Sequence, residues 1–135
     1  MNILVIDGMG GGLGKAAIEN IIQAGISCDI VAVGTNATAA AAMLRAGANN
    51  CATGENAVKY NAKHADVIIG PLGIVFADAM FGEISAKMAK AVIKSSAHKI
   101  LIPVSKCNAT VLGAQDKNLN EHFSEMVGIL KSFAK

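Results

Sequence analysis

The chain has 135 residues, of which 53% are hydrophobic and 16% are charged, and its formal net charge is +2. This composition argues against a disordered chain, and the length favours one domain that spans residues 1–135. No apolar run reaches about 18 residues, which predicts no membrane span. Lys and Arg are scattered and form no basic stripe with interleaved aromatic residues, which argues against a nucleic-acid partner.

The first residues run directly into a short apolar segment, Ile3 to Ile6. A signal peptide has a basic region and a long apolar region instead, so we expect a cytoplasmic protein. The three cysteines are an odd number without metal-ligand spacing. We therefore expect free thiols and no metal site.

Five short segments rich in β-branched residues are predicted as strands. They are Asn2–Asp7, Asp29–Gly34, Asn50–Thr53, Asp66–Pro71 and Lys99–Val104. The second, fourth and fifth are nearly continuous apolar runs, which is typical of strands that are covered on both faces.

Four helices are predicted from apolar spacing and end signals. They cover about Gly12–Ala24, a segment that begins at the N-cap Asn36 and stops at Gly47, about Ser85–Ser96, and about Asn118–Phe133. The second of these helices is rich in Ala, which permits close packing against a sheet or another helix.

The alternation of strands and helices predicts an α/β fold with three layers, in which helices cover both faces of a doubly wound, mostly parallel, five-stranded sheet. Right-handed crossovers leave two strand orders, 3-2-1-4-5, which is Rossmann-like, and 2-1-3-4-5, which is flavodoxin-like.

A glycine-rich turn joins the first strand to the first helix. Its residues are Asp7, Gly8, Met9, Gly10, Gly11, Gly12, Leu13, Gly14 and Lys15. Glycine lets the backbone approach a ligand closely, and a helix N-terminus offers unpaired amides and a partial positive charge. Because so many glycines are not needed for a tight turn, we expect Gly8, Gly10, Gly11, Gly12, Leu13 and Gly14 to bind the phosphates of a dinucleotide.

The spacing of Gly8, Gly12 and Gly14 resembles the glycine motif of short-chain dehydrogenase/reductases over the first third of the chain. That family's catalytic Tyr-x-x-x-Lys is absent, since Tyr60 is followed four residues later by His64. A P-loop is disfavoured because Ala16 follows Lys15 where a hydroxyl is needed. Catalytic residues therefore stay unassigned.

Nearly the whole chain resembles a family of short bacterial proteins known only as a domain of unknown function. The segments that carry this resemblance include Ile6–Gly12, Gly34–Ala37, Ala46–Asn49, Thr53–Ala57, Ile69–Ile74 and Ile100–Pro103. The resemblance implies a Rossmann-like fold and no particular activity.

The end of the second strand meets the adenosine ribose in a Rossmann site, and NAD-preferring enzymes place an acid there. Here Gly34, Thr35 and Asn36 provide none, which favours NADP over NAD as the cofactor. Asn36 is equally explained as a helix N-cap.

Further loops are expected at the same edge of the sheet. Gly70 and Gly73 would let the backbone approach the ligand, and Pro71 would fix the turn. The segments Thr53–Asn56 and Ser105–Asn108 would flank them. Cys107 follows Lys106, so its thiol is either activated by the neighbouring charge or an unreactive small side chain.

The segment Leu72–Ile84 is apolar, with few charges and no predicted element. A ligand, a fold-back helix or another subunit must cover it, and a subunit is the preferred explanation, so we expect a homodimer or a larger homo-oligomer. Three functions remain open: a module that binds NADP or NAD, an NAD(P)-dependent oxidoreductase whose site is completed by oligomerisation, and a flavodoxin-like FMN carrier. The small number of aromatic residues weakens the last.

Overall fold

The computed structural model describes residues 1–104 and 108–134. The strands are β1 (Asn2–Asp7), β2 (Asp29–Gly34), β3 (Asn50–Thr53), β4 (Val67–Pro71) and β5 (His98–Ile102). The helices are α1 (Gly12–Gln23), α2 (Ala37–Ala46), α3 (Glu55–Ala62), the 3₁₀ helix η1 (Leu72–Val75), α4 (Ala86–Lys94) and α5 (Leu119–Phe133).

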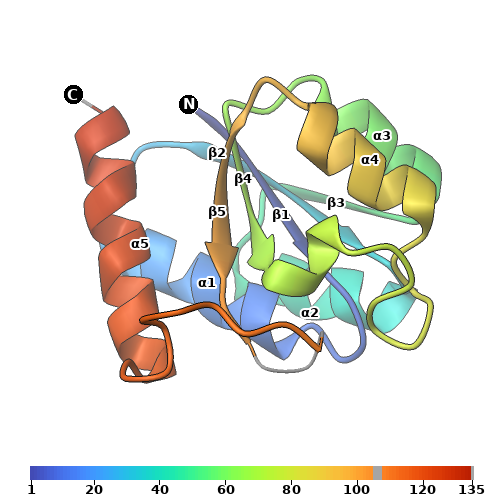
Figure 1. Cartoon of the computed structure of the whole chain (residues 1–135). Helices are drawn as coiled ribbons and strands as arrows, with labels where there is room; N and C mark the ends of the chain where they lie inside the picture. The colour runs from blue at the N-terminus through green and yellow to red at the C-terminus, as the bar shows by residue number, and fades with distance from the viewer. Residues whose placement is uncertain (105–107, 135) are drawn as a thin grey trace.

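The five strands form one sheet in the order β3-β2-β1-β4-β5, and every pair is parallel. Of the two predicted orders, this is the Rossmann-like one. β1 lies at the centre, where it pairs with β2 along its full length and with β4 from Ile3 to Val5. Because all strands run the same way, their carboxyl ends meet at one edge of the sheet (Figure 1).

Helices cover both faces of the sheet, so the predicted three-layer α/β architecture is confirmed (Figure 1). Successive residues of β1 point to opposite faces. Ile3 and Val5 belong to the core beneath α1, α2 and α5, and Leu4 and Ile6 belong to the core beneath α3 and α4. Each such buried aliphatic side chain contributes roughly 1.5–3 kcal/mol through the hydrophobic effect.

Helix α3 was not predicted from the sequence. It has only eight residues, its first turn begins after Gly54 without a side-chain cap, and only Val58 and Ala62 are buried. Two apolar contacts one turn apart give a weak periodic signal, so packing against α4 and the sheet supplies the stability that the local sequence lacks.

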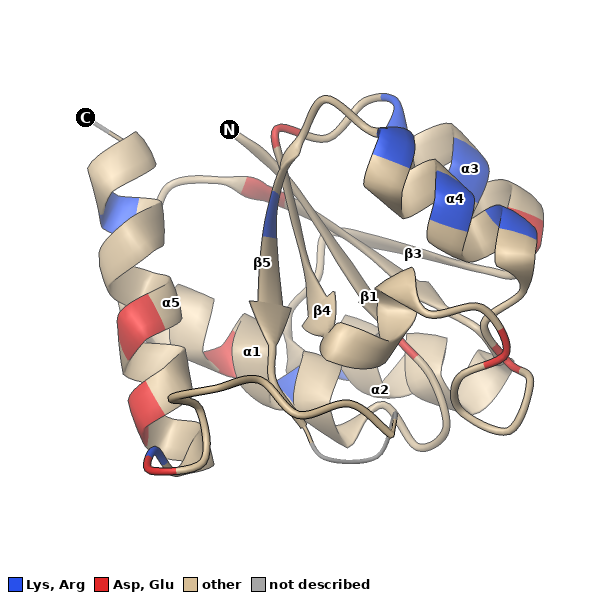
Figure 2. Cartoon of the chain, in the orientation of Figure 1, with Lys and Arg blue, Asp and Glu red and all other residues tan. Residues whose placement is uncertain are grey.

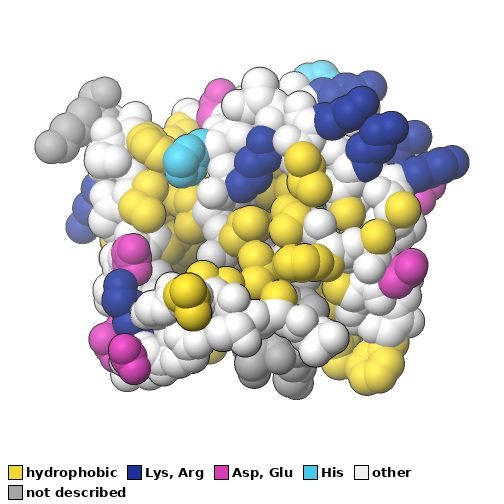
Figure 3. Space-filling model, in the orientation of Figure 1, with side chains coloured by type: hydrophobic (Ala, Val, Ile, Leu, Met, Phe, Trp, Pro, Cys, Tyr) yellow, Lys and Arg dark blue, Asp and Glu magenta, His cyan; other side chains and the backbone are white. Residues whose placement is uncertain are grey.

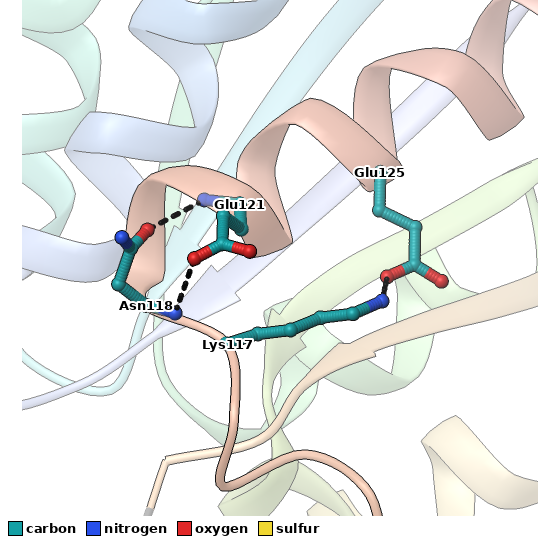
Figure 4. A network of polar contacts seen from close by, with 4 residues as sticks. All are labelled: Lys117, Asn118, Glu121 and Glu125. Atoms are coloured by element: carbon teal, nitrogen blue, oxygen red, sulfur yellow. Dashed lines mark hydrogen bonds and ion pairs between the residues drawn. The ribbon is translucent and has the colours of Figure 1, made fainter.

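Helix α5 shows the opposite case, because its start is defined by local chemistry (Figure 4). The Asn118 side chain accepts a hydrogen bond from the Glu121 amide at 2.9 Å, and the Glu121 carboxylate accepts one from the Asn118 amide at 3.2 Å. This capping box satisfies two amides that the helix leaves unpaired. Lys117 pairs with Glu125 beside it, on the surface.

Within residues 1–104 and 108–134, the structure contains no helix that is both long and apolar enough to cross a membrane. In the same part of the chain, Cys28 and Cys51 are free thiols, as expected, and no cluster of metal-binding side chains occurs.

Candidate functional site: a cleft at the carboxyl edge of the sheet

An open cleft of about 890 Å³ lies at the carboxyl edge of the central strands. It is bounded by the glycine-rich turn after β1 on one side and by residues 76–81 on the other, with Pro71, Gly73, Val104 and Asn108 completing the wall. Seven of the predicted site residues line it: Gly8, Gly10, Gly11, Gly12, Leu13, Pro71 and Gly73. The other five, Gly14, Gly34, Thr35, Asn36 and Gly70, do not.

Asp7 closes the base of the turn. Its carboxylate accepts hydrogen bonds from the Gly8 amide at 2.8 Å and from the Gly14 amide at 2.7 Å, and only 5% of the residue is exposed. Burial raises the pKa of Asp7, while the bonds from Gly14 and Gly8 act in the opposite direction. An internal carboxylate therefore takes the Gly14 amide that we expected to meet a phosphate.

Several turn glycines are closely packed. A Cβ atom at Gly8 would lie 2.7 Å from Met80 Sδ, and one at Gly14 would lie 2.5 Å from Met43 Sδ. Gly11 has a left-handed φ of 75°, and its Cβ would lie 2.8 Å from the Ala39 backbone. The argument that a structural role could not explain so many glycines is therefore wrong for Gly11, and close packing is a second explanation for glycine at the other two positions.

Gly10 and Gly12 are different. A Cβ atom at either position would meet nothing within 4 Å, and both residues are exposed to the cleft. Among the described residues, their backbone amides have no hydrogen-bond partner. Two unpartnered amides thus lie beside the N-terminus of α1, at positions where packing gives no reason for glycine.

Gly34 and Gly70 serve the sheet rather than the cleft. A Cβ at Gly34 would lie 2.5 Å from the Ala40 nitrogen, and one at Gly70 would lie 2.5 Å from the Ile6 carbonyl oxygen. Their glycines allow close packing of strand against helix and of strand against strand.

An acid does stand at the end of β2, although the local sequence lacks one. The Glu83 carboxylate accepts hydrogen bonds from the Thr35 hydroxyl, from Asn36 Nδ2 at 2.8 Å and from the Met9 amide at 3.1 Å. The bond from Thr35 lowers the pKa of Glu83 most, and the other two act in the same direction. Asn36 is also the N-cap of α2, since its Oδ1 accepts from the Ala39 amide at 2.8 Å.

The segment Leu72–Ile84 covers itself in part. Its first four residues form η1, which buries Gly73 and Ile74. Residues 76–83, which we call the strap, then loop out beside the glycine-rich turn and return to the buried Ile84. A covering subunit, the preferred explanation, is thus not needed to bury η1. On the strap, however, Phe81 is 96% exposed and is not covered by the chain itself.

The strap has an unusual backbone. Asp78, Met80 and Phe81 all have left-handed φ angles, between 57° and 66°. Hydrogen bonds within the strap and at its end hold this conformation, including those from the Asp78 amide to the Ile84 carbonyl at 2.7 Å and from the Ile84 amide to the Ala79 carbonyl at 3.1 Å.

Other predicted features contribute less. Glu55 accepts a hydrogen bond from the Ser85 hydroxyl at 2.5 Å, so it links α3 to α4 instead of lining the cleft. The proposed role of Cys107, with Ser105 and Lys106, falls outside the described residues.

The lysines are less scattered in the fold than along the chain. Five of them line a groove between α3 and α4 together with Ala62 and Ala91. Figure 2 shows Lys and Arg positions along these two helices, and Figure 3 shows their side chains gathered on this part of the surface. Among the described residues, the ion pair lies elsewhere, between Lys117, just before α5, and Glu125 on that helix. We call this group, which consists of Lys59, Lys63, Lys87, Lys90 and Lys94, the lysine face.

These features define the class: a Rossmann-like α/β protein with an open cleft beside the first glycine-rich turn. A family model described as "Domain of unknown function (DUF3842)" matches residues 2–135, so the chain belongs to this family. No curated protein matches the chain.

One solved structure with the same fold is a dodecameric FMN-dependent Ubix-like decarboxylase from Escherichia coli O157:H7. The two chains are 14% identical, the TM-score is 0.53, and the match covers 100% of this chain and 96% of the other. The resemblance of the first third to short-chain dehydrogenase/reductases gains no support from these comparisons.

The predicted cofactor, NADP or NAD, is contradicted, because the neighbour with this fold is an FMN-dependent enzyme. The preference for NADP also fails on physical grounds. It assumed that no acid stands near Thr35 and Asn36, whereas Glu83 binds both side chains. A carboxylate at this position would repel a 2′-phosphate.

Proposed function

We propose that this protein binds FMN in the cleft, with the phosphate at Gly10 and Gly12 and the isoalloxazine ring toward the strap. The observation that carries the proposal is the pair of unpartnered amides at Gly10 and Gly12, where neither fold nor packing requires glycine. Such amides at a helix N-terminus are suited to a phosphate.

The far wall of the cleft suits a flat aromatic ring. Phe76, Met80 and Phe81 line it opposite the turn, and Pro71 and Val104 extend the apolar surface. The chain has only four Phe residues, yet two of them stand here. The low aromatic content that weakened the FMN hypothesis is therefore offset by where the aromatic residues lie.

The FMN-dependent neighbour supports this proposal through its fold, and its dodecameric state supports the expectation of a homo-oligomer. Phe81 and Leu112, which are 96% and 91% exposed, provide apolar surface that a second copy could cover. We propose binding without an assigned reaction. Among the described residues, the cleft's carboxylates are Asp7, whose oxygens are engaged by amides, and Asp78 on the strap.

Titration of the purified protein with FMN, followed by flavin fluorescence, tests the proposal. We expect a dissociation constant in the micromolar range or below, which corresponds to about 8 kcal/mol of binding free energy. Gly12→Val should weaken binding at least about tenfold, because its side chain occupies the approach to the phosphate. Gly128→Ala is the matched control, since Gly128 is exposed on α5 and its added Cβ also meets nothing.

Absence of FMN binding by the wild-type protein would overturn the proposal. Equal affinity in the Gly12→Val variant and the wild type would show that the turn is not the phosphate site.

A further inference from the structure

The Glu83 carboxylate connects three segments that are distant in the sequence. It lies at the end of the strap and takes one donor from the glycine-rich turn, the Met9 amide, and two from the end of β2, on Thr35 and Asn36. Asn36 Nδ2 also donates to the Met9 carbonyl oxygen at 2.9 Å. The network closes the β2 side of the turn.

This closed side is where a Rossmann site places the second half of a dinucleotide. The adenosine ribose of such a ligand lies at the end of β2, and the pyrophosphate lies at the turn beside it. Here the hydrogen-bond donors of that region already bind a carboxylate. Met80 adds bulk, because its Sδ lies 2.7 Å from the position that a Cβ of Gly8 would take.

The opposite side of the turn remains open. From Gly10 and Gly12 the cleft continues toward Phe76, Phe81 and Val104. A ligand whose phosphate sits on these two amides therefore has room to extend along this side of the cleft.

We propose that Glu83 is a specificity-determining residue that restricts the cleft to mononucleotides and excludes ligands in which a second nucleotide is joined through a pyrophosphate. This inference rests on the proposed binding of FMN. Its physical basis is that an added adenylate must displace the carboxylate from its three donors or lie beside its negative charge.

A different role for Glu83, as a simple anchor of the strap, makes another prediction. An anchor would affect all ligands of the cleft alike, because its loss would loosen the wall that every ligand contacts. A specificity-determining residue changes the ratio of affinities for short and long ligands. The ratio of the affinities for FMN and FAD distinguishes the two roles, since both ligands carry the same ring and only FAD carries the added adenylate.

Calorimetric titration of FMN and FAD into the wild type and into Glu83→Gln and Glu83→Ala tests the proposal. We expect the wild type to bind FMN at least about tenfold more tightly than FAD. In both variants, FAD affinity should rise about tenfold while FMN affinity stays within about threefold. Glu83→Gln keeps the size of the side chain and one acceptor, so it preserves the strap if Glu83→Ala disturbs it.

Glu19→Gln is the matched control, because it removes one exposed carboxylate from α1 and should leave the FMN to FAD ratio unchanged. If the wild type binds FMN and FAD equally, or if the ratio survives in Glu83→Gln, this inference is wrong while the proposed function stands. If the wild type binds neither flavin, the proposed function fails and this inference fails with it.

Discussion

The glycine-rich turn and the strap face each other across one cleft, and both depend on left-handed backbone. In the turn, this conformation occurs at Gly11, with a φ of 75°, and at Met9, with a φ of 52°. In the strap, three residues with full side chains, Asp78, Met80 and Phe81, adopt the same region, against the single Met9 in the turn. Each such residue costs roughly 1–2 kcal/mol, so contacts at the ends of the strap must supply what the local sequence does not.

The comparison shows that different contacts hold the two walls of the cleft in place. The turn is held from within by the buried Asp7, whose carboxylate binds the amides of Gly8 and Gly14. The strap has hydrogen bonds of its own, but its links to the rest of the protein described above lie at its end, at Glu83 and the buried Ile84. We therefore expect the strap to open before the turn does.

The largest expected effect separates two neighbouring glycines of the turn. Gly11→Ala should lower the free energy of unfolding by about 3 kcal/mol, because it combines left-handed strain with a clash against Ala39. Gly12→Ala should leave it within about 1 kcal/mol of the wild type, and raise it if anything, since alanine favours the helix. Urea unfolding followed by circular dichroism measures both.

Equal stabilities for the two alanine variants would contradict the division of the turn into packing glycines and open glycines. The FMN affinity of Gly12→Ala can then be measured on a protein whose fold is intact.

A smaller effect is expected in the strap, where glycine should be better than alanine. Phe81→Gly should be about 0.5–1 kcal/mol more stable than Phe81→Ala, because relief of roughly 1–2 kcal/mol of left-handed strain exceeds the roughly 0.4–1 kcal/mol cost of glycine's freedom in the unfolded chain. Little packing is lost in either variant, since Phe81 is 96% exposed. Gly82→Ala should lower the free energy of unfolding, because it places a side chain at a left-handed φ of 88°.

Hydrogen exchange of the Gly82 amide, which bonds to the Asp78 carbonyl at 3.1 Å, reports this effect locally. Slower exchange in Phe81→Ala than in Phe81→Gly would show that the strap is not strained.

The smallest effect is the response to acid, and its sign differs between the two walls. The pKa of Glu83 is lowered from its ordinary value of 4.5, so its contribution to stability is present above pH 4.5 and is lost as the pH falls through the lower pKa of the folded state. The pKa of Asp7 is raised from 3.8, so its contribution is present below pH 3.8 and is lost as the pH rises through the raised pKa.

Acidification should therefore release the strap without releasing the turn. In an NMR titration, the Met9 amide and the Asn36 side-chain amide should shift together below pH 4.5, and Glu83→Gln should remove this transition. The idea fails if both signals keep their full titration in that variant.

Much of the fold followed from patterns that are local in the sequence. β1, β2 and β3 have the predicted bounds, and Asn36 caps α2 as predicted. The strand order needed more than this, because both candidate orders satisfy the same right-handed crossovers.

The candidate site was predicted only in part, and the reason is distance along the chain. The turn could be located because its glycines are adjacent. Its division into packing and open positions depends on Met43, Met80 and Ala39, which no spacing rule brings to it. Likewise, the acid at the end of β2 arrives from a segment 48 residues later than Thr35, so a search near β2 could not find it.

The lysine face has a consequence for how the molecule meets charged surfaces. Without its five lysines, the chain has seven Lys and Arg residues against ten Asp and Glu residues, so the small net charge of +2 conceals a strong asymmetry. A protein with this distribution behaves as an electric dipole. On a cation exchanger it should adsorb in one orientation, with α3 and α4 toward the resin, and should elute later than its net charge implies.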